Sequence, residues 1–258
     1  MTIKEIEDVF RRGDVTEDFL NACKCDVRKS VQSILRRYER TQERMRLYAM
    51  YSYERCAAER GNCIVAGIDE AGRGPLAGPV AVAAVILPQE YLLLRLNDSK
   101  KLSEKVREEL YETIVSDAVS YHVELIDAET IDRMNILEAT RRGMYDAVAA
   151  LLPTPQEVLI DAVALPRLRM ASQSIVKGDA KSASIAAASI LAKVTRDRLM
   201  LTYDKEYPVY GFAQHKGYGT REHIEAIRKY GICPLHRKTF EPIRSMIINR
   251  KGCEYCAD

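Results

Sequence analysis

Two adjacent carboxylates mark the part of the sequence with the richest chemistry. Asp69 and Glu70 follow the short apolar run Cys63–Ile68, which predicts a buried strand ending at the acids. Asp161 ends a second short apolar run, Glu157–Ile160. Ligands bind at strand ends in open α/β sheets, and buried neighbouring carboxylates need a neutralising charge. A divalent cation suits this role, because hard cations prefer oxygen ligands.

A further acid, Asp179, follows Gly178 and precedes a long Ala-rich stretch. If the strands ending at Asp69 and Asp161 are neighbours, the three carboxylates of Asp69, Glu70 and Asp161 meet at one rim of the sheet, and Asp179 would join them from the start of the long helix. Four converging acids indicate two cations, which together can stabilise the attacking and leaving oxygens of a phosphoryl transfer. The alternatives are a helix N-cap for Asp179 and a turn cap for Asp161, and the residues alone leave them open. We find no Ser/His/Asp or Cys/His arrangement that suggests covalent catalysis.

Glycine-rich and basic segments accompany the acids. Gly72-Arg73-Gly74 follows the acidic pair directly, and its glycines let the backbone approach a ligand closely. Ser99 and Lys100, in the segment Asp98–Lys101, offer donors for phosphates, although a solvated charged loop is the alternative.

The segment Gly211–Thr220 combines glycines, cations and two aromatic residues. Such a loop can hold a phosphate and stack on a sugar or base. The alternative is a glycine-rich turn with Phe212 in the core.

Alternating strand and helix patterns must position these residues. Strands are expected near residues 63–69, 80–87, 119–126 and 157–161, and helices from Ser103, over 138–152, over 182–207, and near 221–229 and 240–249. This order predicts an α/β domain with a central sheet over residues 61–258. Residues 1–60 lack strand signals and are expected to form a helical N-terminal extension, a candidate substrate-binding appendage.

Charge is distributed unevenly along a chain whose net charge is only +2. Acids outnumber bases by seven over residues 90–161, and bases outnumber acids by nine over residues 164–250. Either a basic track beside an acidic site or solvated helix faces of opposite sign would explain this pattern.

Other features of the sequence bear on the cellular location of the protein and on the redox state of its cysteines. The N-terminus carries no apolar secretory signal and no stretch is apolar enough to span a bilayer, so we expect a cytoplasmic location. Seven cysteines without an export signal favour reduced thiols. The Cys253/Cys256 pair lacks the second pair that a zinc site needs.

Taken in order, the motifs resemble bacterial ribonuclease HII over about Cys63–Arg244. The resemblance rests on these stretches: Asp69–Val80, Asp98–Leu102, Asn135–Leu137, Gly178-Asp179, Ser182–Lys193, His215–Thr220 and Cys233–Arg237.

The resemblance implies a ribonuclease H-like fold with a mixed five-stranded sheet flanked by helices. It implies an endonuclease that cuts the RNA strand of RNA–DNA hybrids and incises 5′ of single ribonucleotides in duplex DNA, leaving 3′-hydroxyl and 5′-phosphate ends. The metal-binding and catalytic acids would be Asp69, Glu70, Asp161 and Asp179, with two Mg²⁺ or Mn²⁺ ions. Substrate would be bound by Gly72, Arg73, Gly74, Ser99, Lys100 and Tyr218, with the glycine loop sensing the 2′-hydroxyl. A monomer is expected.

Three alternative interpretations make different predictions about the residues of the site. Ribonuclease HIII lacks the Gly-Arg-Gly form, so Arg73 and Gly74 favour type HII. A catalytically silent hybrid binder would lack one of the four acids, and none is missing. A transposase or junction resolvase would have no use for a 2′-hydroxyl sensor.

Overall fold

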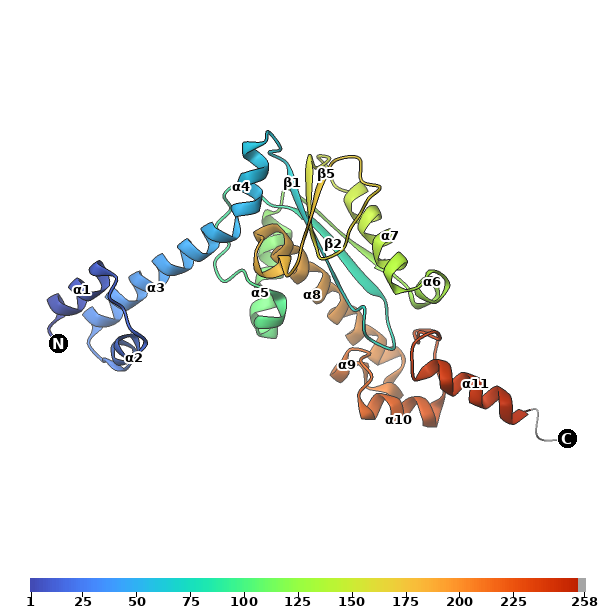
Figure 1. Cartoon of the computed structure of the whole chain (residues 1–258). Helices are drawn as coiled ribbons and strands as arrows, with labels where there is room; N and C mark the ends of the chain where they lie inside the picture. The colour runs from blue at the N-terminus through green and yellow to red at the C-terminus, as the bar shows by residue number, and fades with distance from the viewer. Residues whose placement is uncertain (255–258) are drawn as a thin grey trace. The chain divides into compact units, whose positions relative to one another are not determined.

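The computed structural model describes the backbone of residues 1–254 and the side chains to residue 248 (Figure 1). The chain forms two compact units. The smaller comprises Met1–Ala49 with Leu92–Arg95, and the larger comprises Met50–Tyr91 with the residues from Leu96 onward.

The smaller unit is built from helices α1 (Ile3–Arg12), α2 (Glu17–Cys25) and α3 (Lys29–Met50). Thr2 caps α1 in a reciprocal capping box with Glu5, and Thr16 caps α2. The helices enclose a small cluster of Ile6, Cys23, Val31, Ile34 and Leu35, with Phe10, Phe19 and Leu20 packed against it. Val31, Ile34 and Leu35, which recur at helical spacing on α3, are therefore buried inside this unit.

The larger unit contains a five-stranded mixed sheet in the order β3-β2-β1-β4-β5. Its strands are β1 (Val65–Ala71), β2 (Val80–Ile86), β3 (Ser120–Ile126), β4 (Glu157–Asp161) and β5 (Ala171–Ile175). β1 pairs antiparallel with β2 and parallel with β4. The expectation of a mixed five-stranded sheet flanked by helices is confirmed.

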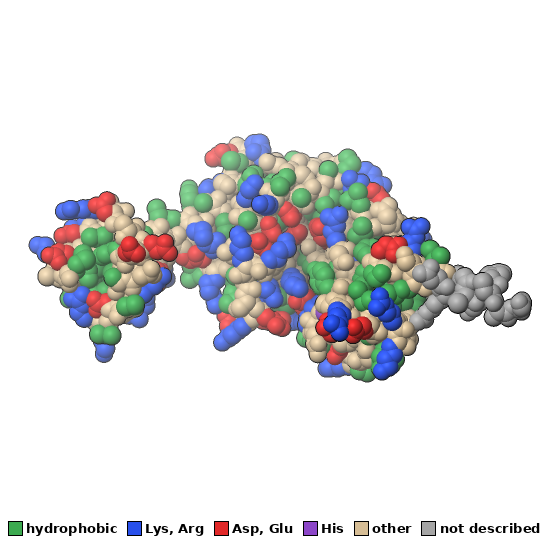
Figure 2. Space-filling view, turned by 60° about the horizontal axis from the view of Figure 1, so that its bottom comes forward, with side chains coloured by type: hydrophobic (Ala, Val, Ile, Leu, Met, Phe, Trp, Pro, Cys, Tyr) green, Lys and Arg blue, Asp and Glu red, His purple; other side chains and the backbone are tan. Residues whose placement is uncertain are grey.

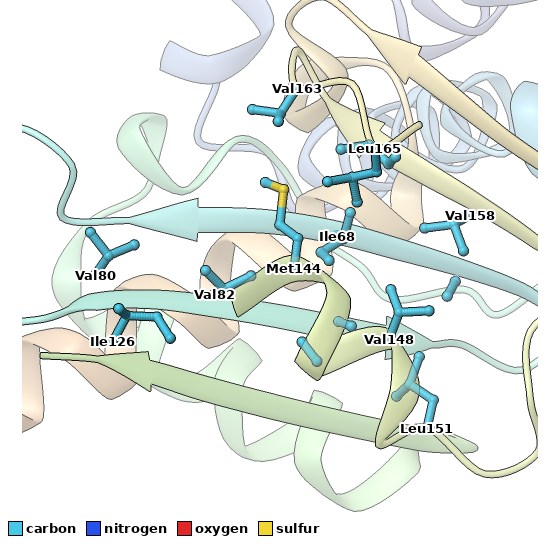
Figure 3. Packing of buried hydrophobic residues seen from close by; sticks show 14 of the residues in the cluster. Ile68, Val80, Val82, Ile126, Met144, Val148, Leu151, Val158, Val163 and Leu165 are labelled. Carbon is cyan, nitrogen blue, oxygen red and sulfur yellow. The ribbon is translucent and has the colours of Figure 1, made fainter. Parts of the chain in front are cut away.

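One face of the sheet packs against α7 (Ile136–Ala149). Met144 and Val148 of this helix lie over Ile68 and Val82 of the sheet, and Figure 3 shows these side chains in one apolar layer. Gly143 allows the close approach, because a Cβ there would lie 3.0 Å from Val82 Cγ2.

The opposite face packs against α8 (Ala183–Glu206), whose Ser182 N-cap accepts from the Ile185 N–H. The alanines of α8 permit a very short distance to β1. A Cβ added to Gly67 would lie 2.1 Å from the Ser184 carbonyl carbon, so strand and helix are in direct backbone contact here.

The remaining elements surround this core. They are α4 (Ser52–Glu59), α5 (Glu104–Asp117), α6 (Ala128–Met134), α9 (Phe212–His215), α10 (Arg221–Tyr230), α11 (Ile243–Glu254) and the 3₁₀ turns η1 (Ser99–Lys101), η2 (Gly178–Ala180) and η3 (Pro208–Tyr210). The C-terminal helices enclose a second apolar cluster around Met200, Phe212 and Ile227. Phe212 is thus a core residue, as the structural alternative for its loop predicted.

Two expectations on thiols and membranes can be compared with this structure. Cys23, Cys25, Cys56, Cys63 and Cys233 are all free thiols. The side chains of Cys253 and Cys256 lie outside the described residues. Among the helices that the structure describes, none combines the length and apolar character needed to cross a bilayer.

Candidate active site

Three carboxylates from separate elements meet at one end of the sheet. Asp69 of β1, Asp161 of β4 and Asp179 of η2 each offer an oxygen within 4.8 Å of the other two. β1 and β4 are parallel neighbours with Ile68 beside Ile160, so the acids that follow these residues lie side by side. The convergence expected from the strand ends is therefore present.

Asp179 reaches the cluster from a tight turn rather than from a helix cap. The Gly178 N–H donates to Asp161 Oδ1 at 2.7 Å, which ties the turn to the end of β4. A side chain at Gly178 would meet Ile185 Cδ1 at 2.6 Å. Because Ser182 is the N-cap of α8, the N-cap alternative for Asp179 is wrong.

Burial and mutual repulsion raise the pKa values of the acids. Asp69 is almost fully buried, and burial together with Glu70 and Asp161 raises its pKa well above the usual range. Burial also raises the pKa of Asp161, although the Gly178 N–H opposes it. These carboxylates are therefore poorly stabilised as anions by the protein alone, which is the electrostatic environment that attracts a cation.

Glu70 lies next to the cluster in a different environment. Its Oε1 accepts from Arg73 Nη1 at 3.2 Å, while its buried Oε2 has no partner among the described residues. Burial raises the pKa of Glu70 despite the Arg73 charge. The free buried oxygen leaves Glu70 able to accept a further ligand.

A cavity of about 370 Å³ opens beside the acids. It brings together eight of the residues expected at the site, namely Asp69, Glu70, Gly72, Arg73, Gly74, Ser99, Lys100 and Tyr218. Lys100 Nζ lies 3.4 Å from Asp179 Oδ2, which connects the cavity to the three-acid cluster. Figure 2 shows acidic side chains of the larger unit with Lys and Arg side chains around them.

The two aromatic residues of the loop Gly211–Thr220 lie in different environments, one in the apolar core and one at the cavity. Phe212 is fully buried, whereas Tyr218 is about half exposed and lines the cavity. Tyr218 Cε1 lies 3.8 Å from the position of a Cβ at Gly74, so the ring stands beside the glycine loop.

Sequence reasoning assigned no role to Ser189, Lys193 or Arg196, which also line the cavity. They lie four and three residues apart on α8, and this polar stripe, which begins within the Ala-rich first half of the helix, was a usable signal. Lys193 pairs with Asp197 at 2.8 Å, and Arg196 is buried.

Comparison with known proteins agrees with this geometry. Residues 66–243 match the family model of ribonuclease HII, and residues 2–59 match that of the ribonuclease HII N-terminal domain. The chain is 48% identical to ribonuclease HII of Bacillus subtilis, covering 95% of this chain and 98% of the relative. It is 50% identical to that of Acetivibrio thermocellus, covering 93% and 96%.

Solved structures show the same fold. The crystal structure of ribonuclease H2 from Pyrococcus horikoshii OT3 superposes with a TM-score of 0.64 at 28% identity, over 72% of this chain and 98% of that one. The chain therefore belongs to the ribonuclease HII family and is a ribonuclease H, an endoribonuclease of a family that acts on RNA–DNA hybrids.

Proposed function

We propose that this enzyme cuts the RNA strand of RNA–DNA hybrids and incises 5′ of single ribonucleotides in duplex DNA, with two divalent ions at Asp69, Glu70, Asp161 and Asp179. The observation that carries the proposal is the meeting of three carboxylates within 4.8 Å beside a cavity lined by Gly72–Gly74 and Tyr218. The products would carry 3′-hydroxyl and 5′-phosphate ends.

The donor set fits Mg²⁺ or Mn²⁺. All three clustered groups are carboxylates, the ligands that hard cations prefer, and their raised pKa values reflect charge that the protein leaves uncompensated. The unpartnered Oε2 of Glu70 offers one more oxygen. When bound, such ions lower the pKa of water and neutralise the charge that develops on the phosphate.

The chain's own residues would orient the scissile phosphate. Lys100, at 3.4 Å from Asp179, can follow a phosphate oxygen because most of its side chain is exposed. Tyr218 offers a ring face to the sugar and base beside the cut. The backbone of Gly72-Arg73-Gly74 would donate to the 2′-hydroxyl, the group that distinguishes RNA from DNA. We expect a monomeric, cytoplasmic enzyme.

A labelled duplex with one ribonucleotide tests the proposal directly. Incision should occur 5′ of the ribonucleotide in Mg²⁺ or Mn²⁺ and stop in EDTA, and an all-DNA duplex should stay intact. Equal cutting of the all-DNA duplex would favour a resolvase-like activity. Tight binding without any cutting would indicate a silent hybrid binder.

Asp161→Asn should abolish incision and leave folding and duplex binding nearly intact. The change is almost isosteric, keeps the Oδ1 that accepts from Gly178, and removes one ligand charge. Loss of a metal ligand should cost several kcal/mol of transition-state stabilisation. Single-turnover rates in Mg²⁺ measure this, and a rate near that of the unaltered enzyme contradicts the assignment.

A further inference from the structure

Arg237 is buried behind the cavity without a carboxylate partner among the described side chains. It is 0% exposed, and its hydrogen-bond acceptors are backbone carbonyl oxygens. A buried guanidinium is costly unless it is fully hydrogen-bonded, so its acceptors indicate what it holds in place.

Arg237 holds the glycine loop by its two ends. Its Nη2 donates to Gly72 O at 2.6 Å and to Gly78 O at 2.8 Å. Its Nη1 donates to Arg73 O at 2.8 Å, and its Nε donates to Gly78 O at 3.1 Å. The planar guanidinium of Arg237 therefore fixes two successive peptide groups, through the carbonyls of Gly72 and Arg73, and also the carbonyl of Gly78, where the loop ends.

The orientation of those peptide groups follows from covalent geometry. The only cis peptide bonds among the described residues precede Pro153 and Pro242, so the peptides joining Gly72, Arg73 and Gly74 are trans. In a planar trans peptide the C=O and the next N–H point in opposite directions. With Gly72 O and Arg73 O directed at Arg237, the N–H groups of Arg73 and Gly74 are directed away from it. Neither N–H donates to another residue in the described part of the chain.

The geometry points to Arg237 as a positioning residue for ribose recognition, because it turns the Arg73 and Gly74 N–H groups outward as two donors for the 2′-hydroxyl. This role rests on the proposed function of the glycine loop. Arg237 itself lies outside the set of residues that line the cavity, so it would act through the loop and not by touching substrate.

The segment Cys233–Arg237 is well fixed for this task. The Arg237 N–H donates to Leu76 O and the Gly78 N–H donates to Leu235 O, both at 2.9 Å. His236 also bridges to Ala77. The loop is thus paired with the backbone of this segment at Leu76 and Gly78, and it is anchored by the Arg237 guanidinium at Gly72 and Arg73.

The same segment reaches the tyrosine beside the loop. His236 Nε2 lies 3.1 Å from His223 Nε2, and His223 Nδ1 lies 2.9 Å from Tyr218 O. The carbonyl can only accept, so His223 carries its proton on Nδ1 and accepts from His236 at Nε2. The backbone of Tyr218 is therefore linked to His236 through His223, and the peptides of the glycine loop are held by the next residue, Arg237.

Arg60 provides a control, because its guanidinium also binds a buried acceptor but lies outside the set of residues that line the cavity. Its Nη2 donates to Glu157 Oε1 at 2.6 Å, at the start of β4 and away from Gly72 and Arg73. Arg60→Lys removes a guanidinium contact and leaves the carbonyl contacts that orient the two N–H groups.

The test measures binding in an Asp161→Asn background, where cutting is blocked. Dissociation constants are determined for a duplex with one ribonucleotide and for the same duplex in DNA alone. Arg237→Lys keeps the charge but loses the fork, and should reduce the preference for the ribonucleotide about fivefold to tenfold, the scale of one or two hydrogen bonds. Affinity for the DNA duplex should stay within about twofold. Arg60→Lys should keep the preference.

A preserved ribonucleotide preference in folded Arg237→Lys, or an equal preference loss in Arg60→Lys, would overturn the positioning role. If Asp161→Asn alone shows no preference, the sensor function of the loop fails instead. Should Arg237→Lys not fold, amide NMR of the Asp161→Asn protein decides: the Arg73 and Gly74 N–H resonances should shift with the ribonucleotide duplex and not with DNA. Unshifted resonances on saturation with the ribonucleotide duplex would also overturn the proposal.

Discussion

Asp69 is buried beside two further carboxylates, an arrangement that destabilises the metal-free protein. A raised carboxyl pKa means that the folded state holds the proton more tightly than the unfolded state. The contribution of Asp69 to stability therefore becomes unfavourable as the pH rises above the ordinary pKa range of a carboxyl group. Asp69→Asn should increase the free energy of unfolding in EDTA at pH 7.5 by about 0.5–2 kcal/mol while abolishing activity. Its Oδ1 can still accept from the Glu70 N–H.

Chemical denaturation in EDTA and in Mg²⁺ measures this effect. Mg²⁺ should stabilise the unaltered protein more than the variant. Asp146→Asn, on the surface of α7, serves as a control and should change stability by less than about 0.5 kcal/mol. A destabilised Asp69→Asn protein in EDTA would show that the buried charge of Asp69 does not destabilise the metal-free protein.

At this scale the sequence indicated the acids but not the residues that support them. Asp69 and Asp161 could be placed because each follows an apolar strand, and strand ends meet when strands are parallel neighbours. Arg237 could not, because its role depends on which carbonyls face it after the C-terminal segment has folded back over residues 72–78. No local pattern encodes such a long-range contact.

Among the elements, the N-terminus of α8 depends on a residue of α4. Glu54 Oε1 accepts from Ser182 Oγ at 2.7 Å and from the Ser184 N–H at 2.9 Å. A carboxylate here complements the helix dipole and holds the start of α8, three residues after Asp179. Glu54→Ala should lower the free energy of unfolding by about 1–2 kcal/mol, the range for loss of a cap, and reduce single-turnover rates.

Glu54→Gln is the informative companion, since it keeps an acceptor oxygen and loses only the charge. We expect it to retain most of the stability and rate. Glu59→Ala, at an exposed position of the same helix, controls for helix propensity. If Glu54→Ala unfolds like Glu59→Ala, the contact between α4 and α8 contributes little.

The buried histidines between α10 and the C-terminal segment predict sensitivity to acid. Burial lowers the pKa of both His223 and His236 to about 4. The unfolded chain takes up these protons near pH 6.5, so stability is full above that value and falls as pH decreases toward about 4. The expected loss is on the order of 3 kcal/mol for each of the two histidines.

Melting temperatures across this pH range, with imidazole NMR titration, check the assignment. His122→Gln is the control, because His122 lies partly exposed on β3 and the variant should keep the same profile. Titration of His223 and His236 near pH 6.5 would show that their burial does not disfavour the charged form.

The elements that were found from sequence share strong local signals. Helices start at Ser103 and Ser182 as expected, each with the serine as its N-cap, and Glu157–Asp161 is a strand as expected. β5 was missed because Ala171–Ile175 is a polar, mostly exposed edge strand without apolar alternation. It is a strand because it pairs with β4, and such pairing depends on residues distant in sequence.

For the whole molecule, the smaller unit presents basic side chains suited to a polyanion. Arg36, Arg40 and Arg44 recur every four residues on α3 and are exposed. Phosphate contacts release counterions, so affinity falls more steeply with salt when more contacts form. Removing residues 1–49 should raise KM and flatten the salt slope, with kcat and metal dependence nearly unchanged.

The three arginines can be tested without truncation. Changing Arg36, Arg40 and Arg44 together to Gln should flatten the logarithmic salt slope by up to about 3, one for each lost phosphate contact. An unchanged slope with a lower melting temperature would mean that the unit only stabilises the protein. A cut after residue 60 is a poorer experiment, since it also removes Glu54 and Arg60, which pairs with Glu157 at 2.6 Å.

Gly67 has no functional group, yet it restricts how this enzyme can be engineered. Glycine inside a strand costs conformational entropy, and replacing it is an ordinary route to a more stable protein. Here any larger residue must push α8 away from β1, because its Cβ would lie 2.1 Å from the Ser184 backbone. Asp69 lies two residues further along that strand, and Asp179 just before that helix. Stabilising designs must therefore treat this position as part of the active site, although no atom of a side chain is present there.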